Sequence, residues 1–115
     1  MEMQNNFATL VKYEDRVELE DNNYCINEYW TKEKTLLKSL TFYDIDDKLH
    51  NSIGPACIEY NMSSNEELFI AYYMHGMKHR TDGPAAIGNY YMLYKDYFLN
   101  DIEYSETEYL VECKK

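Results

Sequence analysis

The stretch that decides the fold is "HGMKHRTDGPAAI", residues 75–87, because a second copy lies upstream as "DDKLHNSIGPACI", residues 46–58. Counted from the glycine of each Gly-Pro pair, the copies are offset by 83 − 54 = 29 residues. A third, less regular copy, "YFLNDIEYS" at 97–105, overlays "YYMHGMKHR" at 72–80 with an offset of 97 − 72 = 25. Self-similarity at such a period is the signature of a repeat architecture.

Each copy contains two kinds of chain reversal. The first is a two-residue turn, where aspartate, asparagine, histidine and glycine tolerate the positive φ that tight hairpins require. The alignment places Asp46 on His75 and Asn100 at these turns, and Tyr43 on Tyr72 before them. The second reversal is Gly-Pro, where glycine tolerates the extended and mirror conformations and proline opens the next strand. The sequence therefore predicts an all-β fold: an antiparallel meander of β-hairpins with a repeating unit of 25–29 residues.

We expect one domain over residues 1–115. Residues 42–115 carry the hairpin repeats, whereas residues 1–41 form either N-terminal hairpins or a separate cap. The segment "TKEKTLLKSLTFYDI" at 31–45 fits one short helix near 31–40 and also fits a strand, which the repeat favours. The tail "TEYLVE", residues 107–112, is predicted to be a closing strand.

The blocks "HRTDGPAAI" (79–87), "YYMHG" (72–76) and "YFLND" (97–101) resemble the HRxDGPA repeats of large DNA virus and phage proteins. These are similar in turn to the MORN-type hairpin repeats of some bacterial antitoxin-like proteins. The resemblance covers residues 42–105. Residues 51–53 depart from it, because Asn-Ser-Ile stands in place of Arg-x-Asp. It implies a twisted single sheet used as an interaction surface, without catalytic residues, and a viral or mobile-element origin.

The chain is acidic, with 21 Asp and Glu against 11 Lys and Arg and a net charge of −10. Direct binding to nucleic acid is disfavoured by repulsion from the phosphates, whereas a protein partner with a basic surface is favoured. One interpretation of the acidic side chains is a solvated surface that prevents strand edges from associating. The other is a partner-binding surface, with these candidate residues: Asp44, Asp46, Asp47, Glu59, Glu66, Glu67, Asp101 and Glu103.

Tyrosine is abundant, with 13 residues against 4 Phe and 1 Trp. Tyrosine is typical of strands and of the centres of protein interfaces. Either a partner or a homodimer covers these rings, or cross-strand tyrosine pairs stabilise a one-layer sheet by themselves. The candidate aromatic partner-binding residues are Tyr72, Tyr73, Tyr90, Tyr91, Tyr94 and Tyr97.

No known catalytic motif is present in the sequence, and we expect a non-enzymatic protein without metal or cofactor. His75 and His79 have the i, i+4 spacing of a helical metal site, but the repeat places His75 at a turn tip and His79 at a packed or hydrogen-bonded position shared with His50. Cys57 beside His50 could suggest a nucleophile and base, but Cys57 aligns with Ala86, a small buried position.

The odd cysteine count, without CxxC spacing, indicates reduced thiols in a cytoplasm, which for a phage protein is that of the host cell. No signal peptide or membrane-spanning stretch is predicted. We therefore expect an inhibitor of a host defence or nucleic-acid-processing complex, acting like an anti-CRISPR by occluding a basic surface. The alternative is an antitoxin-like or structural MORN-type repeat scaffold whose partner does not handle nucleic acid.

Overall fold

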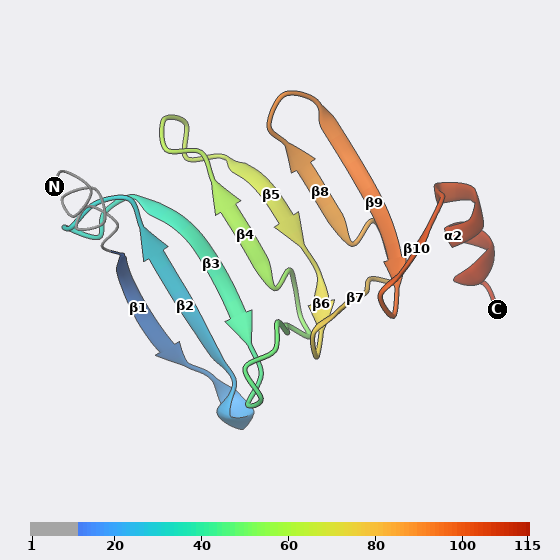
Figure 1. Ribbon diagram of the computed structural model, residues 1–115, viewed down its shortest axis with the longest axis horizontal. Coiled ribbons are helices and arrows are strands. Elements are labelled where there is room, and N and C mark those ends of the chain that lie inside the picture. Colours follow the sequence, from blue (N-terminus) through green and yellow to red (C-terminus); the bar gives the residue numbers. More distant parts are fainter. Residues whose placement is uncertain (1–11) are drawn as a thin grey trace, which may run out of the picture.

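The computed structural model describes residues 12–115 and shows an eight-stranded sheet in the order β1-β2-β3-β4-β5-β8-β9-β10 (Figure 1). A small second sheet, β6-β7, follows the end of β5. The strands are β1 (Tyr13–Glu18), β2 (Tyr24–Tyr29), β3 (Leu37–Tyr43), β4 (Cys57–Tyr60), β5 (Glu67–Ala71), β6 (Tyr73–Met74), β7 (Met77–Lys78), β8 (Ala86–Asn89), β9 (Leu93–Leu99) and β10 (Ile102–Tyr104). The 3₁₀ helix η1 (Glu20–Asn22) joins β1 to β2, and the α-helix α2 (Glu106–Glu112) follows β10.

The predicted antiparallel meander is confirmed, since neighbouring strands of the eight-stranded sheet all pair antiparallel. β2 pairs with β3, and β1 pairs with the outer edge of β2, so residues 12–41 extend the repeat sheet instead of forming a separate cap. The part of that expectation on residues 1–11 lies outside the described residues. The strand prediction is correct for residues 37–43, and the alternative helix near 31–40 is absent, because residues 31–36 form the turn before β3.

The closing strand predicted at residues 107–112 is wrong, because this segment is helix α2. A capping box starts the helix: the Ser105 hydroxyl accepts from the Glu108 N–H at 3.2 Å, and the Glu108 carboxylate accepts from the Ser105 N–H at 3.0 Å. These bonds satisfy backbone donors that a helix start leaves free.

The hairpins of the three repeat copies are numbered here in chain order, with turns at residues 45–47, 75–76 and 100–101. The two-residue turns have the predicted geometry in the second and third of these hairpins. The φ angles are 47° at His75 and 86° at Gly76, and 49° at Asn100 and 70° at Asp101. Positive φ at both central residues defines the hairpin turn that matches the twist of paired strands. The dipeptides His75-Gly76 and Asn100-Asp101 therefore predict these two hairpin turns correctly.

The first hairpin has one residue more in its turn than the alignment assumes. The Asp44 N–H donates to the Lys48 carbonyl at 2.8 Å, and within the intervening residues 45–47 only Asp47 has a positive φ, of 63°. Consequently His50 pairs with Phe42 in this hairpin, as His79 pairs with Tyr72 in the next. The expected match of Tyr43 with Tyr72 is therefore wrong by one residue, since Phe42 takes that place, whereas the match of His50 with His79 is correct.

The Gly-Pro-Ala blocks contribute mainly a buried alanine to the packing, and not a backbone conformation that only glycine adopts. Among the described glycines only Gly76 has a positive φ, so of the extended and mirror conformations that glycine tolerates at the Gly-Pro pairs, the mirror ones are not used. Each block instead places a fully buried alanine beside an aromatic residue of the neighbouring strand. The Phe42 N–H donates to the Ala56 carbonyl, and the Tyr72 N–H donates to the Ala85 carbonyl, both at 2.7 Å.

The pairing register assigns side chains to the two faces of the sheet, because directly paired residues point the same way. One face, called the acidic face here, carries the row Glu14, Glu28, Ser39, Glu59, Phe69, Gly88 and Tyr94. The opposite face, called the groove face, carries the row Asp15, Asn27, Leu40, Ile58, Ile70, Ile87 and Lys95.

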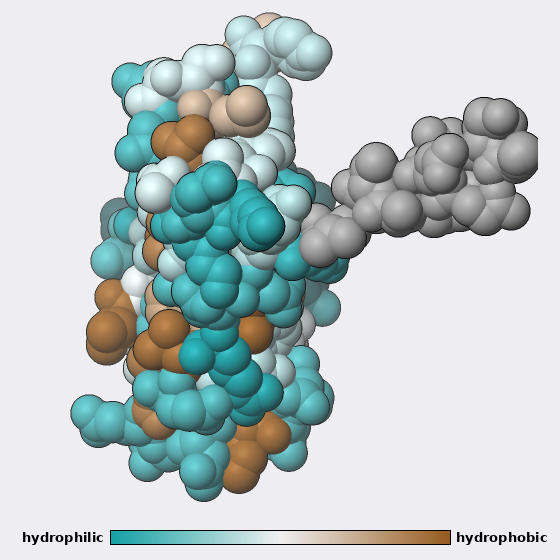
Figure 2. Space-filling model, turned by 90° about the vertical axis from the view of Figure 1, so that its left-hand side faces the viewer, coloured by the Kyte–Doolittle hydropathy of each residue, from teal (hydrophilic) through white to brown (hydrophobic). Residues whose placement is uncertain are grey.

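The sheet has little closed core. Within residues 12–115 no large side chain is completely buried, and four of the seven buried hydrophobic residues are alanines at or beside the ends of strands. Seen edge-on, the surface is mostly hydrophilic with separate hydrophobic patches (Figure 2). No helix in this part of the chain is long and apolar enough to cross a membrane. Cross-strand pairs on two half-exposed faces therefore supply much of the side-chain packing.

Candidate functional site

Three glutamates share one cross-strand row on the acidic face. Glu14 in β1 is directly opposite Glu28 in β2, and Glu28 continues through Ser39 of β3 to Glu59 of β4. Like charges directly opposite each other destabilise a strand pair. The Lys38 Nζ, 3.8 Å from a carboxylate oxygen of Glu28, offsets part of this repulsion. The row thus concentrates negative charge on one face.

Tyr90 and Glu59 form a fixed pair beside this row. The Tyr90 hydroxyl donates to the Glu59 carboxylate at 2.6 Å across 31 residues of sequence. This hydrogen bond, with burial and the Glu59 charge adding to it, raises the pKa of Tyr90 to about 12. The hydroxyl therefore stays protonated at neutral pH, while about half of the tyrosine side chain remains exposed.

Tyr94 extends the same surface across β8. Its ring lies directly over Gly88, where an added Cβ would be only 2.0 Å from a ring carbon of Tyr94. Glycine is thus required at this position for the ring to lie flat on the sheet. A hollow of about 300 Å³ lies nearby, lined by Glu28, Trp30, Lys38, Ser39, Glu59, Tyr60, Leu68 and Tyr90. Acidic and aromatic side chains border a single concave surface here.

The predicted acidic residues do not form one patch. Asp46 and Asp47 lie at the first turn, Glu66 and Glu67 at the far end of the strands, and Asp101 and Glu103 in the third hairpin. Of the predicted eight, only Glu59 lies in the glutamate row of the acidic face. Asp47 and Asp101 also have local roles, since Asp47 accepts from the Tyr24 hydroxyl at 2.5 Å and Asp101 from the Lys78 N–H at 3.2 Å.

Asp44 was expected at a partner surface, but it is 3% exposed. One oxygen accepts from the Asp46 and Lys48 N–H groups, and the other is 2.8 Å from His75 Nδ1. Burial acts to raise the pKa of Asp44, but these hydrogen bonds outweigh it and hold the pKa below its usual value. Asp44 therefore stabilises the first turn and is not available to a partner.

The predicted tyrosines divide between the two faces. Tyr90 and Tyr94 flank the acidic row, and Tyr91 is fully exposed in the loop before β9. Tyr72 is half-buried on the groove face, where the Arg80 guanidinium lies 4.0 Å from its ring centroid. Tyr73, in β6, is half-buried, and burial raises its pKa. Tyr97 lies against the Tyr109 ring of α2, with centroids 4.9 Å apart.

Asp44, His50 and His75 form the single metal-like cluster among the described residues, with candidate ligand atoms within 4.8 Å of one another. The imidazoles of His50 and His75 stack at 4.0 Å with an interplanar angle of 23°. Nitrogen lone pairs lie in the ring plane, so those of two stacked rings do not converge on one ion. His50 Nδ1 already accepts from the His75 N–H at 3.0 Å. The cluster stabilises the packing of one hairpin on the next.

The repeated histidines were predicted to be packed or hydrogen-bonded, and both accept a backbone hydrogen bond. His79 Nδ1 accepts from the Asn100 N–H at 3.0 Å, one repeat after the bond between His50 and His75. His75 is at a turn tip as expected. Burial, with the Glu59 charge adding to it, raises the pKa of the Cys57 thiol to about 11, so the nucleophilic thiolate is disfavoured at neutral pH.

Sequence reasoning missed two residues of the acidic row, Glu14 and Glu28. Both occur in alternating segments, "YEDRVE" and "YCINEY", in which every second residue faces the same side. That alternation indicates a shared face within each strand, but only the pairing register brings Glu14, Glu28 and Glu59 into one row.

Comparison with protein-family models, with curated proteins and with solved structures found no match for this chain.

Proposed function

We propose that this chain is a non-enzymatic protein-binding module whose acidic face binds the basic surface of a partner protein. The observation that carries the proposal is the row Glu14–Glu28–Ser39–Glu59, flanked by the exposed rings of Tyr90 and Tyr94. Facing glutamates repel each other in the free chain, and arginine or lysine side chains of a partner would relieve that repulsion.

The tyrosines supply the apolar part of such an interface. Tyr90 is 49% exposed and is held in place by its bond to Glu59, and Tyr94 is held by its contact with Gly88. Rings that are already ordered lose little conformational entropy on binding, which favours affinity. Acidic groups around them favour fast association with a cationic surface.

The partner we favour is a nucleic-acid-processing or host-defence complex, with the chain occluding the basic surface as an anti-CRISPR-like inhibitor of phage origin. The net charge of −10 supports this proposal, because a surface that binds phosphates also attracts a dense array of carboxylates. The second candidate is a repeat scaffold or homodimer. The aliphatic row of Leu40, Ile58, Ile70 and Ile87, half-exposed on the groove face, favours it.

The test compares capture of bacterial proteins by three immobilised forms of the chain: wild type, a face variant and a charge-matched control. The face variant carries Glu14→Gln, Glu28→Gln and Glu59→Gln. The control carries Asp46→Asn, Glu66→Gln and Glu67→Gln, which remove three exposed charges outside the glutamate row. We expect wild type and control to retain a nucleic-acid-binding protein that the face variant loses.

Two further measurements on the captured protein separate the candidates. An occluding inhibitor is displaced by added double-stranded DNA or RNA, and its affinity falls steeply between about 50 and 200 mM salt. A scaffold binds its partner with little salt dependence and without such competition. Equal losses of binding in the face variant and the control would overturn the assignment to the acidic face.

A further inference from the structure

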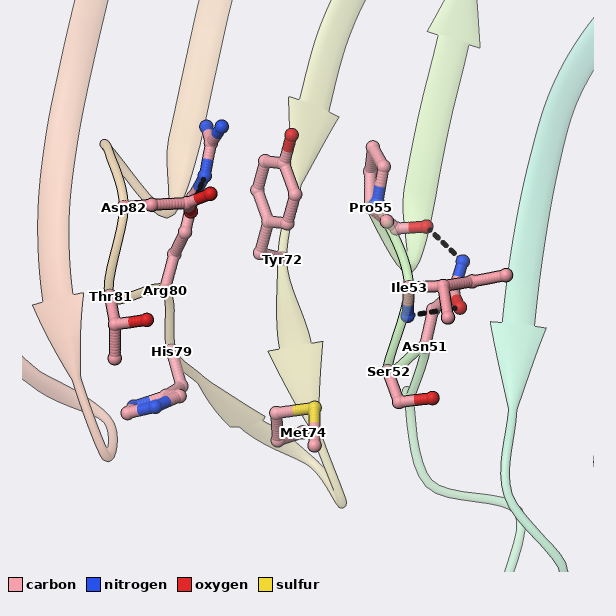
Figure 3. A pocket seen from close by; sticks show the side chains of 11 residues that line it. Asn51, Ser52, Ile53, Pro55, Tyr72, Met74, His79, Arg80, Thr81 and Asp82 are labelled. Atoms are coloured by element: carbon pink, nitrogen blue, oxygen red, sulfur yellow. Dashed lines mark hydrogen bonds and ion pairs between the residues drawn. The ribbon is translucent and has the colours of Figure 1, made fainter.

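The groove face carries a series of related grooves, each between a connecting loop and the aromatic residue of the next repeat; the loop is the β1–β2 turn in the first groove and a Gly-Pro loop in the second. The second, called the open groove here, has a volume of about 650 Å³. It is lined by Asn51, Ile53, Pro55, Tyr72, Met74 and Arg80, among others (Figure 3). A smaller groove of about 320 Å³ lies one repeat earlier, at Phe42 and His50.

The third position in the series is filled by the chain itself. Tyr109 of α2 is 3% exposed, and its ring lies against Tyr97, which corresponds to Tyr72 of the open groove. Its hydroxyl donates to the Arg80 carbonyl at 2.6 Å and accepts from the Gly83 N–H at 3.1 Å. A tyrosine hydroxyl thus satisfies one acceptor and one donor of the second Gly-Pro loop.

The two Gly-Pro loops share the same internal hydrogen bond. In the first, the Asn51 side chain donates to the Pro55 carbonyl at 2.9 Å. In the second, the Arg80 side chain donates to the Pro84 carbonyl at 3.1 Å. Asn51 and Arg80 each donate a side-chain hydrogen bond to the carbonyl four residues later, so they occupy the same position in the two loops. The Asn51 carbonyl therefore corresponds to the Arg80 carbonyl, and the Gly54 N–H corresponds to the Gly83 N–H.

In the open groove these corresponding groups are available. Neither the Asn51 carbonyl nor the Gly54 N–H has a hydrogen-bond partner among residues 12–115. The Tyr72 ring lies between Arg80 on one side and the loop with Asn51 and Pro55 on the other (Figure 3). By comparison with the third groove, a ring equivalent to that of Tyr109 would lie on the side of Tyr72 that faces this loop.

We propose that the open groove is a docking site for a tyrosine side chain of a partner protein, bound in the way the third groove binds Tyr109. The partner tyrosine packs beside Tyr72, and its hydroxyl donates to the Asn51 carbonyl and accepts from the Gly54 N–H. The Cys113 Sγ, four residues after Tyr109, lies 3.7 Å from the Thr81 carbonyl. The occupant is therefore a helical segment with tyrosine at i and a small side chain at i+4.

A foreign segment fits this site better than the chain's own helix or that of a second copy. Tyr109 already has both hydrogen bonds in its own groove, so moving α2 would gain no contact. A second copy would bring another net charge of −10, which opposes association. The site lies on the face opposite the acidic row, so its test is independent of the proposed function.

The probe is a synthetic peptide of residues 105–113 with the change Cys113→Ser, titrated into the full chain at about 150 mM salt to screen repulsion. Amide chemical shifts in NMR report where it binds. We expect the Gly54 amide to shift in a saturable way, with neighbouring loop residues. A peptide with phenylalanine in place of the tyrosine should bind about fivefold to tenfold more weakly, because its ring lacks the hydroxyl.

The full chain with Tyr109→Ala provides the positive control, because it vacates the third groove. The tyrosine peptide should then shift the Gly83 amide as well as that of Gly54, and the stoichiometry should rise from one to two. Shifts at Gly83 in this variant without shifts at Gly54 would overturn the proposal, since the peptide would then be competent and the open groove would not. Absence of shifts at Gly54 in wild type, or equal affinity of both peptides, would also overturn it.

Discussion

The imidazole Nδ1 of His50 accepts a hydrogen bond of 3.0 Å from the backbone N–H of His75, and this bond joins the first hairpin to the second. His79 and Asn100 repeat the relationship between the second hairpin and the third. The His75 ring also stacks on the His50 ring, and the two centroids are 4.0 Å apart. A sheet with little closed core thus depends on polar contacts between repeats.

Replacing His50 with alanine should therefore destabilise the chain. The change removes the acceptor for the His75 N–H and leaves a gap where the His50 ring was 8% exposed, and the lost hydrogen bond and packing together cost about 1–3 kcal/mol. Denaturant unfolding followed by circular dichroism measures the loss. His79→Ala is the matched control: it removes the same bond at a more exposed hairpin and should cost less, about 0.5–1.5 kcal/mol. A larger loss at His79 would contradict this ranking.

The same bond makes folding sensitive to acid. Burial lowers the pKa of His50 from 6.5; a charge on His75 adds to this effect and Asp44 opposes it. As the pH falls below about 6.5, the unfolded chain binds a proton that folded His50 takes up only at lower pH. The contribution of His50 to stability is therefore complete above pH 6.5 and decreases as the pH falls through the folded-state pKa.

Denaturant unfolding at pH 7.5, 6.5, 5.5 and 5.0 measures this dependence. Wild type should lose stability over the lower part of the range, whereas His50→Gln should start lower at neutral pH and show a shallower slope. Identical slopes for the two proteins would mean that another group, and not His50, titrates on folding.

Local signals in the sequence were sufficient for the second and third two-residue turns. His75-Gly76 and Asn100-Asp101 consist of residues that adopt positive φ at low cost, and both form the expected turns. The first turn was misaligned, because an extra residue in a hairpin is compatible with Asp-rich sequence and only the strand pairing reveals it. In the tail, the alternation of "TEYLVE" fits a strand, but Ser105 and Glu108 have the spacing of a capping box, which starts a helix.

The candidate site could be predicted only in part, because it depends on register between distant strands. Glu59 and Tyr90 were both selected as partner-binding residues, yet their hydrogen bond spans 31 residues and depends on β5 and β8 lying side by side. Asp44 was selected for its charge and proved to be buried. A carboxylate that binds a partner and one that caps a turn have the same local sequence, and only the neighbouring hairpin distinguishes them.

Replacing Gly88 with alanine should destabilise the sheet, because the new Cβ would overlap the Tyr94 ring, 2.0 Å from its nearest carbon. The ring must move off the strand, and because Tyr94 is 39% exposed it can do so at a cost of about 1 kcal/mol. Gly54→Ala is the control, since the nearest atom to an added Cβ there is 3.7 Å away and φ is not positive. Thermal unfolding compares the two variants. Equal melting temperatures would show that the Tyr94 ring is not held on Gly88.

Replacing Asp44 tests whether this carboxylate stabilises the turn or belongs to a binding surface. Asp44→Ala removes the acceptor for the Asp46 and Lys48 N–H groups and the partner of His75, and should cost about 2–4 kcal/mol. Asp44→Asn keeps an amide oxygen for the backbone donors and should cost about 1 kcal/mol. The control, Asp46→Asn, changes an exposed neighbour and should stay within about 0.5 kcal/mol of wild type in denaturant unfolding. Equal effects of Asp44→Ala and Asp46→Asn would place Asp44 at the surface, because a solvated carboxylate can be removed without leaving backbone donors unpaired.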